Sequence, residues 1–138
     1  MIGLFFHGKK GAEEMKEYRV SKRMEIAGAH HLDLPYESPC SRTHGHNWVV
    51  TVHCKSDKLT DYGMIVDFAK VKKEIHGVLD HQCMNELFEF NPTAENMAEW
   101  ICHRVTELCE YGFCYKVEVQ ESEGNVAVFQ CDEEEAFK

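Results

Sequence analysis

The alternation of apolar and polar residues predicts two strands in the first half of the chain. In residues 18–30 apolar side chains recur at every second position over much of the segment (Tyr18, Val20, Met24 and Ile26). This alternation is typical of a strand with one buried face, and the same parity places His30 on the buried side. Residues 44–54 are rich in β-branched and aromatic side chains, which favours a second strand.

Two more strands are predicted near the C-terminal end. Residues 114–122 alternate so that Val117, Val119 and Glu121 share one face. The tripeptide EGN then leads into residues 126–131. A glycine turn between two alternating segments predicts a hairpin.

Helical spacing dominates the middle of the chain. Residues 66–81 carry apolar side chains three and four positions apart, and Asp67 can cap the first turn. Residues 91–112 form the clearest helical pattern, with Thr93 near its start and Gly112 at its end. The order strand, strand, helix, helix, strand, strand predicts an α+β fold, with a four-stranded antiparallel sheet and two helices packed on one face.

Length and composition indicate a single domain. The chain has 138 residues, of which 43% are hydrophobic, enough for one core. We interpret residues 15–138 as that domain and residues 1–14 as an N-terminal extension with the composition of a mobile segment. The acidic segment 132–138 is expected to be solvated.

Charge and cysteine content narrow the class of protein further. Fifteen basic and 24 acidic residues give a net charge of −9, which disfavours binding to nucleic acid. No apolar run approaches the roughly 20 residues that a membrane span needs, and no secretory segment opens the sequence. The seven cysteines are an odd number and cannot all pair, so we expect a protein of the reducing cytoplasm.

Histidines gather where the first two predicted strands are joined. His44 and His46 are two positions apart on one strand and therefore share a face, with Cα atoms about 6.5–7 Å apart. His30, at the end of the neighbouring strand, is the best-placed third imidazole. Three histidine ligands leave a fourth position for water or substrate, which is the pattern of a catalytic zinc site. The alternative is that the His-x-His pair is only a polar strand face.

Further positions carry candidate chemistry. Cys40 lies four residues before His44, and near a dication its thiol can act as a base or nucleophile; a buried structural cysteine is the alternative. Asp80 and His81 lie together just past a predicted helix, where both can reach a common pocket. The inward carboxylate of Glu121 can accept two hydrogen bonds from a pterin-like or guanine-like edge, or it can be a solvated strand end.

Several motifs resemble those of the 6-pyruvoyl-tetrahydropterin synthase family over about residues 18–130. The matching stretches, in chain order, are IAGAHHL, CSRTHGHNW, GMIVDFAKVK, LDHQCMNE, NPTAENMAEWI and VEVQES. The spacing of three residues between Cys40 and His44 is similar to that in the bacterial branch, the 6-carboxy-tetrahydropterin synthases. Ile26 replaces an aromatic residue usual in the family, and His31 stands where arginine is frequent.

The resemblance implies a T-fold, in which α+β subunits join around an axis and their sheets form a barrel. It also implies a homohexamer of two trimers, with active sites between subunits. In the implied site, the Zn²⁺ ligands are His30, His44 and His46. The implied catalytic residues are Cys40, Asp80 and His81, and the implied anchor of the pterin ring is Glu121.

The resemblance also implies a reaction. The substrate would be the small molecule 7,8-dihydroneopterin triphosphate, converted to 6-carboxy-tetrahydropterin in the queuosine pathway with release of triphosphate and acetaldehyde. The alternatives are a 6-pyruvoyl-tetrahydropterin synthase and a non-catalytic pterin- or purine-binding module with structural zinc. The cations nearest in sequence to the site, and so candidates to bind the triphosphate, are Lys22, Arg23 and Arg42.

Overall fold

Four long antiparallel strands form most of the sheet. The computed structural model describes residues 16–138, so the expected extension at residues 1–14 lies outside the described residues. The strands are β1 (Tyr18–His30), β2 (His44–Ser56), β4 (Phe113–Ser122) and β5 (Asn125–Gln130). They pair in the order β1-β2-β4-β5, each antiparallel to its neighbour. The four predicted strands and their antiparallel pairing are confirmed.

A short fifth strand makes the sheet mixed rather than purely antiparallel. Strand β3 (Gln82–Cys83) pairs in parallel with β1 at Gly28 and Ala29. A Cβ atom at Gly28 would lie 2.8 Å from the carbonyl oxygen of Gln82 and 2.9 Å from Cε of Met84, so only glycine permits this approach. The prediction of four strands was therefore one short, because two residues are too few for an alternation pattern.

The first predicted helix is present but is not uniform. It consists of three consecutive segments, α2 (Phe68–Val71), the π-helical η2 (Lys72–His76) and α3 (Gly77–Leu79). The side chain of Asp67 accepts a hydrogen bond from the backbone N–H of Ala69 at 2.8 Å. The predicted helix cap is therefore confirmed.

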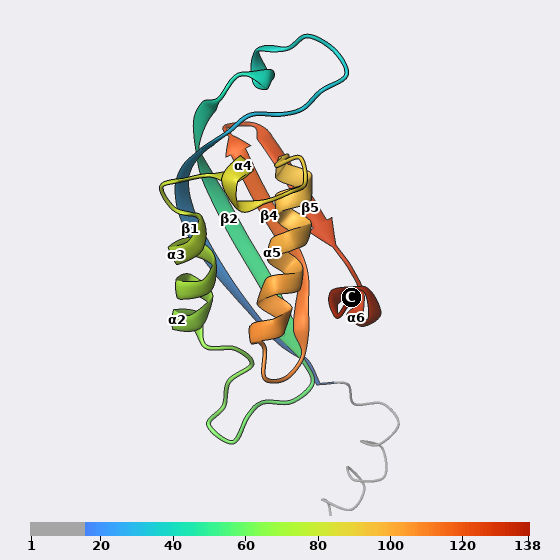
Figure 1. Cartoon of the computed structure of the whole chain (residues 1–138). Helices are drawn as coiled ribbons and strands as arrows, with labels where there is room; N and C mark the ends of the chain where they lie inside the picture. The colour runs from blue at the N-terminus through green and yellow to red at the C-terminus, as the bar shows by residue number, and fades with distance from the viewer. Residues whose placement is uncertain (1–15) are drawn as a thin grey trace, which may run out of the picture.

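The second helix, α5 (Ala94–Leu108), packs against β4 and β5, whereas the first packs against β1. Both helices lie over the same face of the sheet, as predicted (Figure 1). Thr93 caps α5 by accepting a hydrogen bond from the N–H of Asn96 at 3.1 Å. Helix α5 ends four residues before the predicted end at Gly112, which instead takes φ +73° in the turn that leads into β4.

Three short helical segments complete the described chain: η1 (Pro39–Ser41), α4 (Met84–Leu87) and α6 (Glu133–Ala136). The prediction of a solvated acidic tail is correct for Glu133 and Glu134, which are exposed, but wrong for Ala136, which is buried. Asp132 caps α6 by accepting a 2.9 Å hydrogen bond from the N–H of Glu135. This capped turn packs against β4 and α5.

The core lies between the helix-bearing face of the sheet and the two helices. Its members are apolar side chains that alternate along the strands and recur at helical spacing, among them Ile26, Trp48, Val50, Val52, Val117, Val119, Met97, Ile101 and Val105. No helix within residues 16–138 is long and apolar enough to cross a membrane.

Candidate metal centre and active site

The pairing of β1 with β2 brings the three predicted histidines to one face of the sheet. His30 lies directly opposite His44, and Gly28 lies opposite His46. Opposite residues in an antiparallel pair, and residues two apart in one strand, point to the same face. The alternation pattern alone therefore accounts for the convergence of the three imidazoles.

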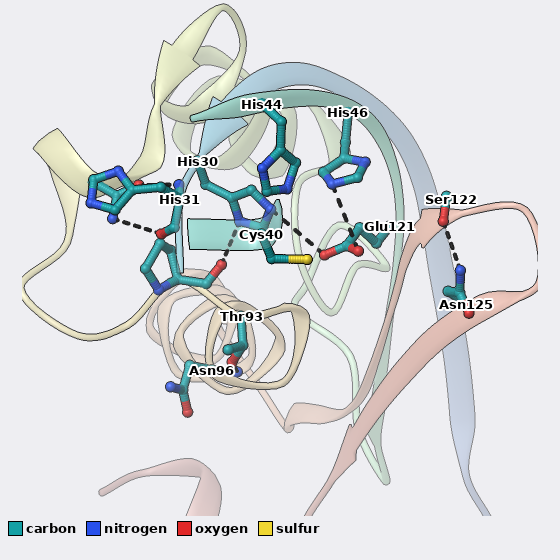
Figure 2. A network of polar contacts seen from close by, with 12 residues as sticks. His30, His31, Cys40, His44, His46, Thr93, Asn96, Glu121, Ser122 and Asn125 are labelled. Carbon is teal, nitrogen blue, oxygen red and sulfur yellow. Dashed lines mark hydrogen bonds and ion pairs between the residues drawn. The ribbon is translucent and has the colours of Figure 1, made fainter. Parts of the chain in front are cut away.

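The three imidazoles are close enough to share one cation. One nitrogen atom from each ring lies within 4.8 Å of the corresponding atoms of the other two. The ring centroid of His30 lies 4.6 Å from that of His44 and 5.1 Å from that of His46, and the His44 and His46 centroids are 4.9 Å apart. Figure 2 shows the three rings close together, and their planes are steeply inclined to one another.

Backbone carbonyl groups orient two of these rings. The Nδ1 atom of His30 lies 2.7 Å from the carbonyl oxygen of Pro92, and Nδ1 of His44 lies 2.7 Å from that of Arg42. A carbonyl oxygen only accepts, so each Nδ1 carries the proton and donates it. The lone pair is therefore on Nε2 in both rings, and this outer hydrogen bond is the usual support of a metal-binding histidine.

Burial keeps the histidines ready to bind a cation. Within residues 16–138 the Nε2 atoms of His30 and His46 are buried and have no hydrogen-bond partner. Burial lowers the pKa of both imidazoles below the ordinary value, mainly because the charged form loses its water. Neutral rings with buried, unpaired nitrogen atoms fit a divalent cation such as zinc.

The carboxylate of Glu121 faces this cluster from β4. Its Oε2 atom lies 3.7 Å from Nε2 of His30, and its Oε1 atom lies 3.7 Å from Nε2 of His46. Both distances exceed that of a hydrogen bond, so the carboxylate retains acceptor capacity. Glu121 is thus directed inward, as the alternation along β4 predicted (Figure 2).

Asp80 and His81 form a hydrogen-bonded pair beside β1. The carboxylate of Asp80 accepts from the N–H of Ala27 at 2.9 Å and from Nδ1 of His81 at 2.7 Å. The first of these hydrogen bonds, followed by the second, lowers the pKa of Asp80 below its ordinary value. His81 has φ +61°, and its side chain is 80% exposed.

The structure does not bring all the predicted residues together within one chain. Cys40 is exposed on η1, where its N–H donates to Oγ of Ser38. Within residues 16–138, neither the thiol of Cys40 nor the ring of His81 forms a hydrogen bond with the three imidazoles. The imidazoles and Glu121 form one cluster. Cys40 on η1 lies near it, because its carbonyl oxygen accepts a 2.8 Å hydrogen bond from the N–H of Leu32, two residues after His30. The Asp80–His81 pair lies beside β1.

Sequence reasoning missed one neighbour of this pair. Nε2 of His76 lies 3.8 Å from Oδ2 of Asp80, the same oxygen that accepts a hydrogen bond from His81. The carboxylate of Asp80 therefore faces two imidazoles. The i, i+4 spacing of His76 and Asp80 at the end of a predicted helix was the available signal.

The three cations predicted to bind the triphosphate lie at different distances from the centre. Lys22 and Arg23 lie on β1, seven or more residues before His30. At the rise of a strand this places them roughly 23 Å or more from the metal centre of their own chain. Only Arg42, whose carbonyl oxygen supports His44, is next to the centre.

Comparison with known proteins identifies the family of this chain. The family described as 6-pyruvoyl tetrahydropterin synthase matches residues 19–132. A Bacillus subtilis protein named 6-carboxy-5,6,7,8-tetrahydropterin synthase is 33% identical over 101 residues, which are 68% of this chain and 69% of that protein. A human 6-pyruvoyl tetrahydrobiopterin synthase is 28% identical over 142 residues, covering 88% of this chain and 97% of the human protein.

A solved structure confirms the fold. The 6-pyruvoyl tetrahydropterin synthase of Caenorhabditis elegans superposes with a TM-score of 0.68 at 24% identity, covering 86% of this chain and 98% of that one. The expected T-fold is therefore correct. The family match spans nearly all of the described residues, and the chain belongs to the 6-pyruvoyl tetrahydropterin synthase family.

Proposed function

We propose that this protein is a zinc-dependent 6-carboxy-5,6,7,8-tetrahydropterin synthase. It converts 7,8-dihydroneopterin triphosphate and water to 6-carboxy-5,6,7,8-tetrahydropterin, triphosphate and acetaldehyde, in 7-deazaguanine (queuosine) biosynthesis. The observation that carries the proposal is the convergence of three imidazoles with an inward carboxylate at one end of the sheet. The names of the Bacillus subtilis relative and of other relatives support the same activity.

The ligand set of the metal centre is His30, His44 and His46. When bound, zinc supplies Lewis acidity that makes the hydroxyl groups of the substrate side chain easier to deprotonate. The carbonyl groups of Pro92 and Arg42 keep two of the rings in the required tautomer. Three protein ligands are the usual number where a coordination position is kept for substrate.

Glu121 anchors the pterin ring in this proposal. A carboxylate offers two acceptor oxygens, which match adjacent ring N–H and amino donors of a pterin. Its position 3.7 Å from both His30 and His46 puts a ring bound by Glu121 next to the metal centre. The substrate side chain, rather than its ring, would then face the imidazoles.

Cys40 and the Asp80–His81 pair move protons on the side-chain carbons. Because Asp80 accepts the Nδ1 proton of His81, the lone pair of a neutral His81 is on Nε2, where it can accept a proton. The high exposure of His81 supports a role for this pair at the metal centre of a neighbouring chain. Cys40 is exposed and free to approach bound substrate.

We infer that the assembly is a homohexamer of two trimers. Strand β5 is one edge of the described sheet, and β3 covers β1 only at Gly28 and Ala29, so most of β1 forms the other edge. Unpaired edges are open to pairing with another chain, and closure into a barrel removes them. This pairing would also bring Asp80 and His81 to a neighbour.

The decisive experiment incubates the zinc-loaded protein with 7,8-dihydroneopterin triphosphate and identifies the products by mass. Release of acetaldehyde together with 6-carboxy-tetrahydropterin is the expected result. A 6-pyruvoyl product without acetaldehyde would instead favour the second candidate function, which the human relative supports.

A Cys40→Ala variant separates an enzyme from a non-catalytic binding module. We expect this variant to bind zinc and pterin but to lose most turnover. If neither protein turns over while both bind zinc and pterin, the protein is a binding module. Turnover of the variant at the wild-type rate would remove the assigned role of the thiol.

A further inference from the structure

A second set of metal-ligating side chains lies on α5 and α6, outside the cluster of three imidazoles. Glu99 and His103 are four residues apart on α5, so they project from the same side of the helix. Glu135 of α6 completes the set, and one ligand atom from each of the three residues lies within 4.8 Å of the other two. Two helices thus supply one nitrogen and two oxygen ligands.

The Nε2 atom of His103 is buried without a hydrogen-bond partner. Four buried side-chain nitrogen atoms in the described chain share this property, and two of the others belong to the metal-centre ligands His30 and His46. A buried polar atom without a partner costs free energy until a ligand or an ion satisfies it. Nε2 of His103 thus lacks a hydrogen-bond partner, as Nε2 of His30 and of His46 does, although the His103 side chain is 28% exposed.

The distance between His103 and Glu135 suits two ligands of one ion better than a direct hydrogen bond. Nε2 of His103 lies 3.5 Å from Oε2 of Glu135, which is longer than the usual N–H···O bond of about 2.7–3.2 Å. Two ligands about 2.0–2.1 Å from a tetrahedral zinc ion are about 3.3–3.4 Å apart. In contrast, Nε2 of His53 lies 2.7 Å from Oε1 of Glu118, as in an ordinary hydrogen-bonded pair.

Two of the three side chains border open space, and Glu135 approaches His103 from outside that space. His103 and Glu99 line a surface hollow of about 290 Å³ together with Phe90, Asn96 and Trp100. The other carboxylate oxygen of Glu135 faces Nζ of Lys138 at 3.6 Å, which leaves Oε2 directed at His103. Mixed imidazole and carboxylate ligands favour zinc and its neighbours over magnesium, which prefers oxygen alone.

We propose that Glu99, His103 and Glu135 bind a second divalent transition-metal ion, which fastens α6 to α5. The site is separate from the proposed catalytic centre and does not depend on its activity. The ion would connect a four-residue helix that otherwise docks mainly through Ala136 to the longest helix of the described chain. Its role is structural, because it holds three side chains from two elements in one place.

Zinc stoichiometry tests this proposal on the full chain. Chelator-treated protein is reloaded with Zn²⁺, freed of unbound metal by gel filtration and analysed for zinc per chain. We expect His103→Ala to lower the zinc content by one ion per chain relative to the wild type, and the isosteric Glu135→Gln to lower it in the same way. His53→Ala is the matched control, because His53 also pairs with a glutamate but lacks a third ligand, and it should keep the full content.

Two further measurements keep the test independent of folding and of the catalytic proposal. Zinc should slow amide hydrogen exchange in α6 several-fold in the wild type and in His30→Ala, but not in Glu135→Gln. Product formation should persist in His103→Ala, which separates this site from the first. An unchanged zinc content in both His103→Ala and Glu135→Gln, or an equal loss in His53→Ala, would overturn the proposal.

Discussion

Glu121 is the residue whose position most restricts what the centre can bind. It lies on β4 after the buried residues Val117 and Val119, and it faces two imidazole nitrogens with one oxygen each. The Glu121 side chain is 28% exposed, and both of its oxygens lie beyond hydrogen-bond distance of these nitrogens, so they can accept from a bound ligand. The geometry thus favours a ligand with two adjacent N–H groups.

Glu121→Gln should weaken pterin binding roughly 10- to 100-fold, because one acceptor becomes a donor that faces donors. Isothermal titration with a non-reactive pterin measures this change, and zinc content should stay at the wild-type level. Glu118→Gln, on the same strand but paired with His53, is the control and should bind as the wild type does. Equal pterin affinity in all three proteins would remove the anchoring role.

Asp80 should make the free energy of unfolding decrease as the pH falls in the acid range. Its pKa in the folded protein lies below the ordinary value of 3.8, because the N–H of Ala27 and the ring of His81 favour the charged form. The unfolded state therefore binds the proton more readily, and stability falls as pH falls. The contribution of Asp80 to stability is fully present above the pKa that Asp80 has in the unfolded state. It is lost as the pH falls through the pKa that Asp80 has in the folded state.

Urea denaturation of the wild type and of Asp80→Asn across about pH 5 to pH 2 checks this sign. The advantage of the wild type should be largest at the upper end and should shrink toward the lower end. A difference in free energy of unfolding that stays constant over this range would show that the carboxylate is not stabilised in its charged form.

Sequence patterns could locate the inward side chains but not their backbone partners. Period-two alternation predicted that His30, His44 and His46 share a face and that Glu121 points inward, in agreement with the strand register and the contacts of Glu121. The carbonyl group of Pro92 that orients His30 comes from a loop 62 residues away, and no local pattern encodes such a contact.

At the scale of elements, strands and long helices were predictable, and the short segments were not. Strands β1, β2, β4 and β5 and both long helices carry repeated apolar spacing, over ten or more residues in most cases. The strand β3 and the helix α6 have two and four residues, too few for a period to show. Their positions are set by tertiary contacts such as those at Gly28 and Ala136.

The turn between α5 and β4 offers a test of packing at this scale. Gly112 has φ +73°, and a Cβ atom there would overlap the carbonyl oxygen of Lys55. Gly112→Ala should therefore destabilise the fold by about 3 kcal/mol or more, since the left-handed backbone alone costs about 1–2 kcal/mol and the overlap adds to it.

Gly124→Ala is the matched control for this substitution. Gly124 also has a positive φ, +85°, but a Cβ atom there would have no neighbour within 4 Å. Its cost should be limited to about 1–2 kcal/mol from the backbone conformation. Urea unfolding of both variants gives the comparison, and equal losses would contradict the close contact between Gly112 and β2.

At the scale of the whole molecule, we propose that a second chain completes the active site. The imidazoles and Glu121 cluster within the chain, while His81 is exposed beside the edge of the sheet. The resemblance to the family implies active sites between subunits. Alternation along one sequence carries no information about contacts between copies, so the assembly itself could not be derived from the pattern of residues.

Mixing two inactive variants tests whether sites are shared. Neither His30→Ala nor His81→Ala should turn over alone, because one lacks a proposed metal ligand and the other the proposed proton carrier. When the two variants are dissociated, mixed in equal amounts and reassembled, about a quarter of the sites should regain activity. At these sites one chain supplies an intact His30 and its neighbour supplies an intact His81. Mixed assemblies, verified by native mass spectrometry, that remain fully inactive would place the whole site in one chain.

Diffraction at the zinc absorption edge from crystals of the zinc-loaded protein tests the central claim most directly. We expect an anomalous peak about 2.0–2.1 Å from one nitrogen each of His30, His44 and His46, with no fourth protein atom bound to it. A loaded protein without a peak among these rings, or with Glu121 completing a closed tetrahedral set, would contradict a catalytic metal centre.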